Sequence, residues 1–470
     1  MDVTARLREL VGSDGLLADA SLIEPLLADY RGLYRGRALA VVQPDSTAAV
    51  SRLLAWCNEQ RIGVVPQGGN TGYCGGATPD ASGTQLLVSL RRLNRLRSVD
   101  AANFSLVAEA GCTLASVQAA AATVDRLFPL SLGSEGSCQI GGNLATNAGG
   151  TAVLRYGMMR ELTLGIEAVL ADGSVVSSLS PLRKDNTGYN LSQLLVGSEG
   201  TLGIITAACL KLFPASRHIA TAWVAVPSPA AAVTLLEHLR SASADRLSTL
   251  ELLPGIAVEL VLQHVEAARD PGLAPSPWYL LVELSSSGTG GGLDATLQAA
   301  LASAVESGLA TDAAIAHNES QRENFWRLRE SVPEAQRRAG HSLKHDISVP
   351  VASLPEFIVQ GSALAAQLAP EGYLVAYGHL GDGNLHFNIN QRAGSDSATF
   401  RGREAPLRRA VHDLVAGLGG SFSAEHGIGQ LKVAELERYA QPAELAAMRQ
   451  IKQALDPHGI LNPGKLLRST

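Results

Sequence analysis

Three glycine-rich segments in the first half of the chain constrain its fold more than any other feature. They read PQGGNTGYCGG (66–76), LGSEGSCQIGGNLATNAGG (132–150) and VGSEGTLGI (196–204). Glycine permits left-handed dihedrals and lets backbone approach a ligand closely, so successive N–H groups can line an anion site. The side chains among these glycines are mostly neutral hydrogen-bonding groups. None of the segments matches a Rossmann or P-loop pattern, so we expect another kind of site for a large polar cofactor.

The pattern of strands and helices around these segments has the alternation that is typical of an α/β fold. Residues 39–42 and 64–66 read as strands, and Ser46 is expected to cap the helix between them, which runs to about Gln60. An Asp172-Gly173 turn between residues 164–170 and 174–176 predicts a hairpin.

The texture changes after Phe213-Pro214. Residues 219–226 read as a strand and 230–240 as a helix, because Pro227 and Pro229 interrupt what would otherwise be a long apolar run. We predict three parts, residues 1–214, 215–421 and 422–470.

Composition narrows the class of protein. The 470 residues carry a formal net charge of −6 and no block of Lys or Arg, so no nucleic-acid partner is expected. Five cysteines without CxxC spacing are expected to be reduced and buried. The first residues lack a basic head followed by an apolar run, so a cytoplasmic location is expected.

Two histidine motifs lie in the second half. Residues 378–386 (GHLGDGNLH) place two imidazoles on either side of a Gly-Asp-Gly turn, and residues 424–429 (AEHGIG) pair a carboxylate with an imidazole. Two imidazoles and a carboxylate suit Zn²⁺ or another first-row divalent ion with open positions for substrate oxygens. Structural histidines with satisfied hydrogen bonds remain the alternative, and Asp382 can be a turn residue or a partner of a ligand.

A charged segment, residues 318–340, reads as a helix that Pro333 should kink. Arg322 and Arg329 are seven residues apart and share a face, and Lys344 follows in a strand-like stretch. Fixed cations of this kind suit substrate carboxylates, although a solvated helix face is the alternative.

The glycine-rich motifs, together with NAGG and YGM (156–158), resemble the FAD domain of the vanillyl-alcohol-oxidase (PCMH) type over residues 39–214. The resemblance implies two α+β subdomains and non-covalent FAD, because the first loop has no histidine to attach it. It places residues 67–72 around the diphosphate, the 134–150 segment near the ribityl and flavin groups, and the 199–204 segment near adenine. The implied cofactor residues are Pro66, Gln67, Gly68, Gly69, Asn70, Thr71, Gly72, Ser134, Gly141, Gly142, Thr146, Asn147, Gly150, Glu199, Gly200 and Ile204.

HLGDGNLH with AEHGIG resembles the C-terminal domain of FAD-linked D-2-hydroxy-acid dehydrogenases, the D-lactate and D-2-hydroxyglutarate type, over residues 215–467. This implies an α+β substrate (cap) domain with an antiparallel sheet, followed by a C-terminal segment, residues 422–470, that returns to the FAD domain. The resemblance assigns roles to these residues: His379, His386 and Glu425 bind the metal, His426 is the catalytic base, Arg329, Lys344 and Asn384 bind substrate, and Asn462 of LNPGK contacts the isoalloxazine region. Pro333 departs from the family, because glutarate-oxidising relatives can place a hydroxyl there.

The expected activity is oxidation of a small D-2-hydroxy acid (D-2-hydroxyglutarate, D-lactate or D-malate) by FAD and a divalent metal, with Zn²⁺ expected. The C2 hydride would pass to flavin N5 and the hydroxyl proton to His426. A separate acceptor, an electron-transfer flavoprotein or a quinone, is expected, and a homodimer is possible. The alternatives are a flavin oxidase of the same fold that uses O₂, a zinc hydrolase, and a non-catalytic carrier.

Overall fold

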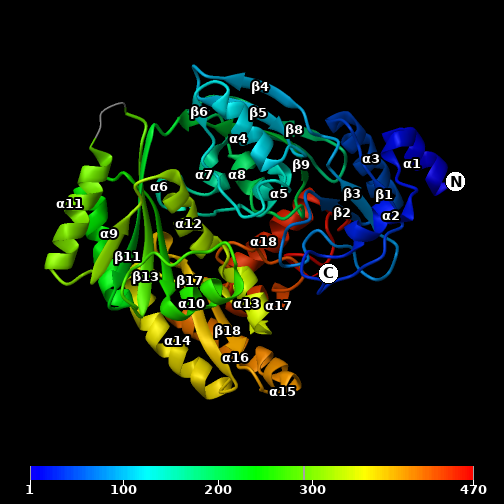
Figure 1. The fold of residues 1–470 in the computed structure, drawn as a ribbon. Helices are drawn as coiled ribbons and strands as arrows, with labels where there is room; N and C mark the ends of the chain where they lie inside the picture. Colours follow the sequence, from blue (N-terminus) through cyan, green and yellow to red (C-terminus); the bar gives the residue numbers. More distant parts are fainter. Residues whose placement is uncertain (1, 289–291, 469–470) are drawn as a thin grey trace. The chain divides into compact units, whose positions relative to one another are not determined.

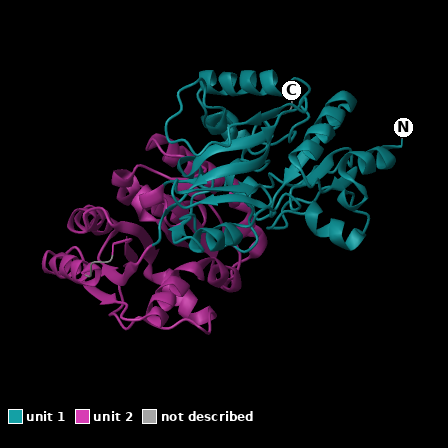
Figure 2. Ribbon diagram, turned by 90° about the horizontal axis from the view of Figure 1, so that it is seen from above, with its two compact units in different colours: residues 1–150, 157–215, 425–470 teal, residues 151–156, 216–424 magenta. Residues whose placement is uncertain are grey.

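The computed structural model describes residues 2–288 and 292–468. These residues divide into two compact units, coloured separately in Figure 2. Unit 1 comprises Met1–Gly150, Gly157–Ala215 and Glu425–Thr470, and unit 2 comprises Thr151–Tyr156 and Ser216–Ala424. Within the described ranges, no helix is both long enough and apolar enough to cross a membrane.

Unit 1 begins with a small parallel sheet of strand order β1-β3-β2 (Figure 1). The predicted cap is confirmed, because the Ser46 side chain accepts the Ala49 N–H at the start of α3. Apolar side chains of α1, α3 and the three strands form one core. The elements of this part are α1 (Val3–Val11), η1 (Ser13–Gly15), α2 (Ala20–Ile23), η2 (Glu24–Leu27), β1 (Ala40–Val42), α3 (Thr47–Gln60), β2 (Val64–Gln67) and β3 (Leu86–Ser89).

Unit 1 also contains an antiparallel sheet of strand order β4-β5-β9-β7-β8. The predicted hairpin is confirmed, since β7 and β8 pair across the Asp172-Gly173 turn. The elements are β4 (Leu96–Asp100), β5 (Ser105–Glu109), α4 (Leu114–Ala122), β6 (Arg126–Leu127), α5 (Ile140–Ala145), α7 (Met159–Leu162), β7 (Thr163–Val169), β8 (Val175–Ser177), α8 (Leu191–Leu195), β9 (Ile204–Lys211) and β10 (Phe213–Pro214), the last pairing with β6.

The C-terminal segment of unit 1 joins the parallel sheet. It contains α17 (Val433–Tyr439) and α18 (Pro442–Leu455). After α18, Leu461 forms a parallel bridge with Val64 of β2, and the Asn462 N–H donates to the Val64 carbonyl at 2.8 Å. Leu461 and Asn462 therefore lie beside the strand that leads into the first glycine-rich loop.

Unit 2 is built on an antiparallel sheet of order β14-β11-β13-β12-β17-β18-β15, with β16 also paired to β18. The predicted strand and helix at 219–240 are confirmed as β11 and α9. The elements are α6 (Val153–Tyr156), β11 (His218–Val226), α9 (Pro229–Ala242), β12 (Leu247–Pro254), α10 (Gly255–His264), β13 (Trp278–Ser286), α11 (Leu293–Glu306), β14 (Asp312–Ile315), α12 (Glu319–Glu330), α13 (Val332–Ala339), β15 (Ser342–Leu343), β16 (Asp346–Ser348), η3 (Val351–Ser353), α14 (Leu354–Leu368), β17 (Gly372–His379), η4 (Leu380–Asp382), β18 (Asn384–Gln391), α15 (Ser397–Gly402) and α16 (Glu404–Gly417).

Alternate residues of these strands pack against helices on opposite faces of the sheet. In β11, Ala222 and Val224 belong to a core shared with α9, α11, α14 and α16, whereas Trp223 and Ala225 belong to a core shared with α10, α12 and α13. The period of two in side-chain direction therefore produces a three-layer unit of helices, sheet and helices. The predicted kink is also present: α12 ends at Glu330, and Pro333 lies in the first turn of α13.

One predicted boundary needs correction. Residues 151–156 were assigned to the first domain, but they cluster with unit 2. Leu154 of α6 packs against the unit 2 core, and the Thr249 hydroxyl donates to the Thr151 carbonyl at 3.2 Å. The packing of this short helix places it in unit 2, although the residues before and after it in the chain belong to unit 1. The cysteine prediction is confirmed, because all five thiols are buried and none of them forms a disulfide among the described residues: Cys57, Cys74, Cys112, Cys138 and Cys209.

Candidate functional site

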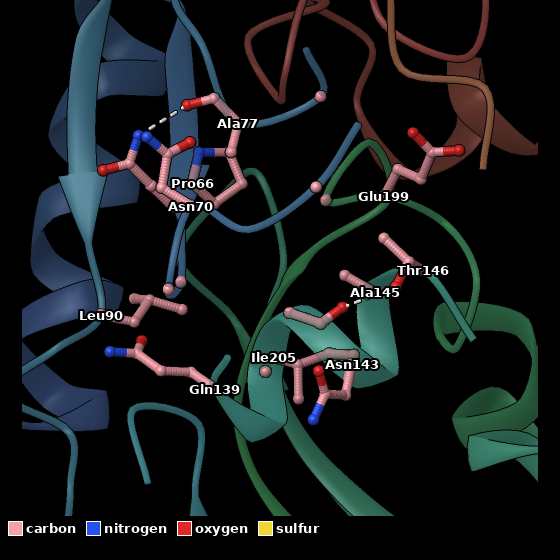
Figure 3. Close-up of a pocket in the computed structure, with 18 of the residues that line it drawn as sticks. Pro66, Asn70, Ala77, Leu90, Gln139, Asn143, Ala145, Thr146, Glu199 and Ile205 are labelled. Carbon is pink, nitrogen blue, oxygen red and sulfur yellow. Dashed lines mark hydrogen bonds between the residues drawn. The ribbon is translucent and has the colours of Figure 1, made fainter. Parts of the chain in front are cut away.

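A pocket lies among the glycine-rich segments of unit 1 (Figure 3). Its wall is drawn from residues 66–77, which end β2 and continue into the first loop, from residues 139–146 around α5, and from residues 199–205 at the start of β9. Leu90 and Gln139 lie together on one side of the pocket, and Glu199 lies on the other. Three segments that are far apart in sequence thus meet around one cavity.

Most of the residues predicted to bind cofactor line this pocket: Pro66, Gln67, Gly68, Gly69, Asn70, Thr71, Gly72, Gly141, Gly142, Thr146, Glu199, Gly200 and Ile204. Ser134, Asn147, Gly150 and Asn462 are not part of the wall that the described residues form. The wall also contains residues that the sequence analysis did not single out: Cys74, Gly76, Ala77, Leu90, Gln139, Asn143, Ala145, Gly203 and Ile205. Most of these are sequence neighbours of predicted residues, and that proximity was the available signal.

The pocket fits a polar ligand that donates hydrogen bonds. Among the described residues, the buried Oε1 atoms of Gln67 and Gln139 have no hydrogen-bond partner, although the Gln67 amide nitrogen donates to the Leu26 and Ala77 carbonyls at 2.9 Å. A buried acceptor left unsatisfied costs about 1–3 kcal/mol. A Cβ added at Gly142 would meet nothing within 4 Å, so the backbone is open to a ligand there. The hydroxyl and N–H groups of FAD are donors that suit these oxygens.

Glu199 ties the third glycine-rich segment to the C-terminal turn. Its carboxylate accepts the backbone N–H groups of Ile428 and Gly429, both at 2.7 Å. Burial raises the pKa of this carboxyl, against the opposing effect of the two amides and of Lys432. The Asn462 amide donates to the carbonyls of Gly76 (2.9 Å) and Glu199 (2.7 Å). Both side chains therefore bind the protein's own backbone and hold the pocket loops together, and their predicted cofactor contacts stay predictions.

His426 lies in the wall of the same pocket. Its turn is sharp, because Gly427 (φ 72°) and Gly429 (φ 53°) adopt the left-handed region that favours glycine. The imidazole packs against the ring of Tyr73 in a T-shaped contact, with the ring centroids 4.6 Å apart. Beside it, the Glu425 carboxylate accepts the Gly150 N–H at 3.0 Å. The fold thus brings the predicted base to the cavity formed by the glycine-rich loops.

In unit 2, the Gly-Asp-Gly turn brings two imidazoles together as predicted. His379 ends β17, η4 makes the turn, and His386 lies in β18. Their ring centroids are 5.9 Å apart. The turn needs glycine at Gly383 (φ 79°), where a Cβ would lie 2.0 Å from the Val349 carbonyl oxygen. Glu425, the third predicted ligand, belongs to unit 1.

A buried carboxylate that the sequence analysis missed orients His379. Glu251 of β12 contacts His379 Nδ1 through Oε1 at 2.6 Å and Arg329 Nε through Oε2 at 2.6 Å. Burial alone would raise the pKa of Glu251, but Arg329 and His379 outweigh it and lower the pKa to about 2. Because Nδ1 is engaged, Nε2 is the nitrogen with which His379 would bind a metal. The available signal was a single acidic residue within the apolar strand LSTLELLP.

The residues predicted to bind substrate lie in different environments. Arg329 is buried, with its guanidinium 5.0 Å from the centroid of the Tyr377 ring, whereas Lys344 is exposed between β15 and β16. The Asn384 amide nitrogen donates to Asp346 Oδ1 (3.0 Å) and the Ile347 carbonyl (2.9 Å). Its buried Oδ1 has no partner among the residues described. The substrate roles of Arg329, Lys344 and Asn384 stay predictions.

Strand β18 carries a polar face of which the sequence analysis singled out only Asn384 and His386. Its sequence, NLHFNINQ, alternates polar and apolar residues, so Asn384, His386, Asn388 and Asn390 share one face. Gln336 of α13 satisfies two of them, since it donates to Asn390 Oδ1 at 2.7 Å and accepts from Asn388 Nδ2 at 3.0 Å. The alternation was a readable signal for a strand with one functional face.

Comparisons with known proteins are consistent with this geometry. Residues 38–178 match the family model "FAD binding domain", and residues 215–466 match "FAD linked oxidases, C-terminal domain". The D-2-hydroxyglutarate dehydrogenase of Bos taurus is 39% identical over 454 residues, covering 96% of this chain and 81% of its own. That of Arabidopsis thaliana is 37% identical (98% and 80% covered), and that of Xanthomonas citri pv. viticola is 34% identical (98% and 96% covered).

The chain belongs to the FAD-linked D-2-hydroxy-acid dehydrogenase family. It is therefore an FAD-dependent oxidoreductase with an FAD-binding domain in its first half. Solved structures support the predicted fold class: p-cresol methylhydroxylase aligns with a TM-score of 0.76 at 17% identity, covering 99% of this chain and 96% of its own. Alkyldihydroxyacetonephosphate synthase aligns at 0.73 and 18% identity, covering 98% and 84%. At these identities the likeness concerns the fold alone.

Proposed function

We propose that the chain oxidises D-2-hydroxyglutarate to 2-oxoglutarate. The substrate is suggested by relatives named D-2-hydroxyglutarate dehydrogenase, which match nearly the whole chain at 34–39% identity. The observation that carries the reaction type is the presence of His426 in the wall of the pocket formed by the glycine-rich loops. A base beside a flavin site is the arrangement that oxidation of an alcohol carbon requires.

The proposed chemistry divides between the cofactor and the chain. Bound FAD would supply the hydride acceptor for the hydrogen on substrate C2. His426 takes the hydroxyl proton, because imidazole titrates near neutral pH. The loops at 66–72 and 141–146 would hold the cofactor through backbone N–H groups and neutral side chains. The first loop contains no histidine, which supports non-covalent FAD; acid precipitation tests this, because colour left in the pellet would show a covalent link.

We also propose a divalent metal, Zn²⁺ in the first instance, at His379 and His386. The ion would polarise the substrate hydroxyl and lower its pKa. Support comes from the adjacent imidazoles and from Glu251, since a carboxylate on Nδ1 fixes the ring and makes the other nitrogen a better ligand. The assignment of Glu425 as a third ligand rests on the sequence resemblance.

The substrate proposal is tested by anaerobic bleaching. Mixing the purified yellow protein with D-2-hydroxyglutarate should remove the visible absorbance of oxidised flavin, and D-lactate and D-malate should act more slowly. Bleaching by D-lactate alone would overturn the choice of substrate. Pro333 makes the comparison between these substrates informative. It offers no side-chain donor at the start of α13 for the second carboxylate of D-2-hydroxyglutarate.

Removal of the metal should lower turnover strongly. Dialysis against a chelator is expected to reduce activity by at least about tenfold, because a bound divalent ion usually contributes several kcal/mol to stabilising the charge on the reacting oxygen. Added Zn²⁺ should restore the activity, and the FAD content should not change. Full activity after dialysis, with metal shown to be absent by elemental analysis, would contradict the metal proposal.

The electron acceptor distinguishes the dehydrogenase from a flavin oxidase of the same fold. If air alone reoxidises the bleached protein within one turnover time, the oxidase alternative is correct. If reoxidation needs an electron-transfer flavoprotein or a quinone analogue, the proposed dehydrogenase is correct. Family membership removes the ground for the zinc hydrolase alternative. A homodimer and a cytoplasmic location stay proposals that sedimentation and cell fractionation would test.

A further inference from the structure

The backbone around His426 is held by hydrogen bonds from the first glycine-rich loop. The Cys74 carbonyl accepts the N–H groups of Gln430 (3.0 Å) and Leu431 (3.3 Å), and the Gln430 side chain donates to the Gly75 carbonyl at 2.9 Å. The Cys74 thiol also donates to the Gly427 carbonyl at 3.4 Å. With the bonds from Glu199, these contacts fix where the His426 side chain leaves the backbone. They do not fix its rotation about χ1 and χ2.

The ring of Tyr73 lies where it can limit that rotation. Tyr73 belongs to the same loop, one residue before Cys74, and its ring meets the imidazole at an interplanar angle of 79° and a centroid distance of 4.6 Å. Behind it, the Tyr30 ring lies 5.8 Å away. The loop that carries Tyr30 is itself held, since the Asp29 carboxylate accepts the N–H groups of Arg31 (3.1 Å) and Tyr34 (2.6 Å). Tyr73 therefore has aromatic neighbours in both Tyr30 and His426, and the loop of Tyr30 is held by local hydrogen bonds.

The geometry points to Tyr73 as a positioning residue for the catalytic base. The inference rests on the proposed role of His426. A base must lie within hydrogen-bond reach of the proton it removes, and a displacement of about 1 Å can cost roughly a hundredfold in rate. Tyr73 packs edge to face against the imidazole and so restricts the ring to one orientation. The packing uses the aromatic ring, so the phenol hydroxyl is dispensable.

Two substitutions separate the ring from the hydroxyl. Tyr73→Ala should lower the rate constant for flavin reduction roughly tenfold to a hundredfold at saturating D-2-hydroxyglutarate, with KM changed less than about threefold, because the base is displaced while the substrate site is intact. Tyr73→Phe should restore the rate to within about twofold of the wild type. Rates are measured by anaerobic stopped flow and normalised to bound FAD, so loss of cofactor cannot imitate the effect.

Tyr189→Ala is the matched control. Tyr189 is also in unit 1, is 97% exposed, and belongs to neither the pocket nor the histidine turn. Its removal should leave the reduction rate, FAD content and melting temperature unchanged. Tyr73→Ala should keep the melting temperature of the holoenzyme within a few degrees, about what loss of one half-exposed side chain produces.

The double variant decides between positioning and an independent role. If Tyr73 acts through His426, then Tyr73→Ala should slow the His426→Ala protein no further, because coupled residues are not additive. Additive losses would overturn the inference, as would a normal rate for Tyr73→Ala or a Tyr73→Phe protein as slow as Tyr73→Ala. If His426→Ala alone reduces its flavin normally, the proposed base is wrong. If His426→Ala reduces its flavin slowly but Tyr73→Ala reduces it at the normal rate, the positioning role of Tyr73 is wrong and the proposed base stands.

Discussion

Replacing His426 with alanine is expected to slow anaerobic reduction of the flavin by D-2-hydroxyglutarate by about 10²–10⁴-fold, the usual contribution of a positioned acid or base. The imidazole lies in the wall of the pocket among the glycine-rich loops, where no other described histidine contributes to the lining. The FAD content should be retained, because the loops at 66–72 and 141–146 supply the remaining wall. The measurement is the stopped-flow rate per bound flavin across a range of pH.

The matched control is His458→Ala, which removes an exposed imidazole of unit 1 that contacts Asn58 at 3.0 Å. Its reduction rate should equal that of the wild type. The acidic limb of the wild-type pH profile, where a base becomes protonated and inactive, should disappear in His426→Ala. A His426→Ala protein that bleaches at the normal rate would remove His426 from the mechanism and leave the base to be found elsewhere.

Replacing Glu251 with glutamine should destabilise unit 2 by about 3–5 kcal/mol, the range found when one partner of a buried ion pair is removed. The side chains of Glu251 and Arg329 are 1% and 8% exposed, so the substitution leaves the guanidinium buried without its counter-charge. Urea unfolding followed by tryptophan fluorescence measures the change, since Trp223, Trp278 and Trp326 all lie in this unit. Glu334→Gln is the control: it breaks an exposed pair with Arg338 and should cost less than about 1 kcal/mol.

The stability that Glu251 contributes should decrease as the pH falls. Its pKa is about 2 in the folded protein against the ordinary 4.5, so the ionised form stabilises the fold. The contribution, about 3 kcal/mol at 1.36 kcal/mol per pKa unit, is complete above pH 4.5 and is lost as the pH falls from 4.5 towards 2. Glu251→Gln should remove this pH dependence in that window. Equal acid sensitivity of the two proteins would show that the network contributes nothing to stability.

The same substitution should weaken metal binding. Without the carboxylate on Nδ1, the His379 ring loses the partner that fixes its orientation, and losses of about 10–100-fold in metal affinity are usual for such partners. Zn²⁺ titration of the apoprotein at neutral pH, where the variant remains folded, separates this effect from the loss of stability. Unchanged affinity would show that Glu251 supports the fold alone.

Local sequence patterns were sufficient where the cause of a structure is local. The Ser46 cap, the Asp172-Gly173 hairpin and the break at Pro333 each depend on neighbouring residues, and each was predicted correctly. The proximity of His379 and His386 was also predictable, because a short Gly-Asp-Gly turn reverses the chain and brings the two imidazoles close together. Dense glycine among neutral donors indicated a ligand site, and the three glycine-rich segments do line one pocket.

Long-range contacts were decided by tertiary structure. Glu251 is 78 residues from Arg329 and 128 from His379, and no periodicity in the chain connects them. Tyr73 and His426 are brought together only when the C-terminal segment returns to β2, and Glu199 meets Ile428 and Gly429 by the same return. Residue types and turn geometry can be predicted from the local sequence. The partners of a buried charge depend instead on which strands become neighbours in the folded sheet. The sequence therefore identified the chemical groups, and the packing of the sheets determined which of them act together.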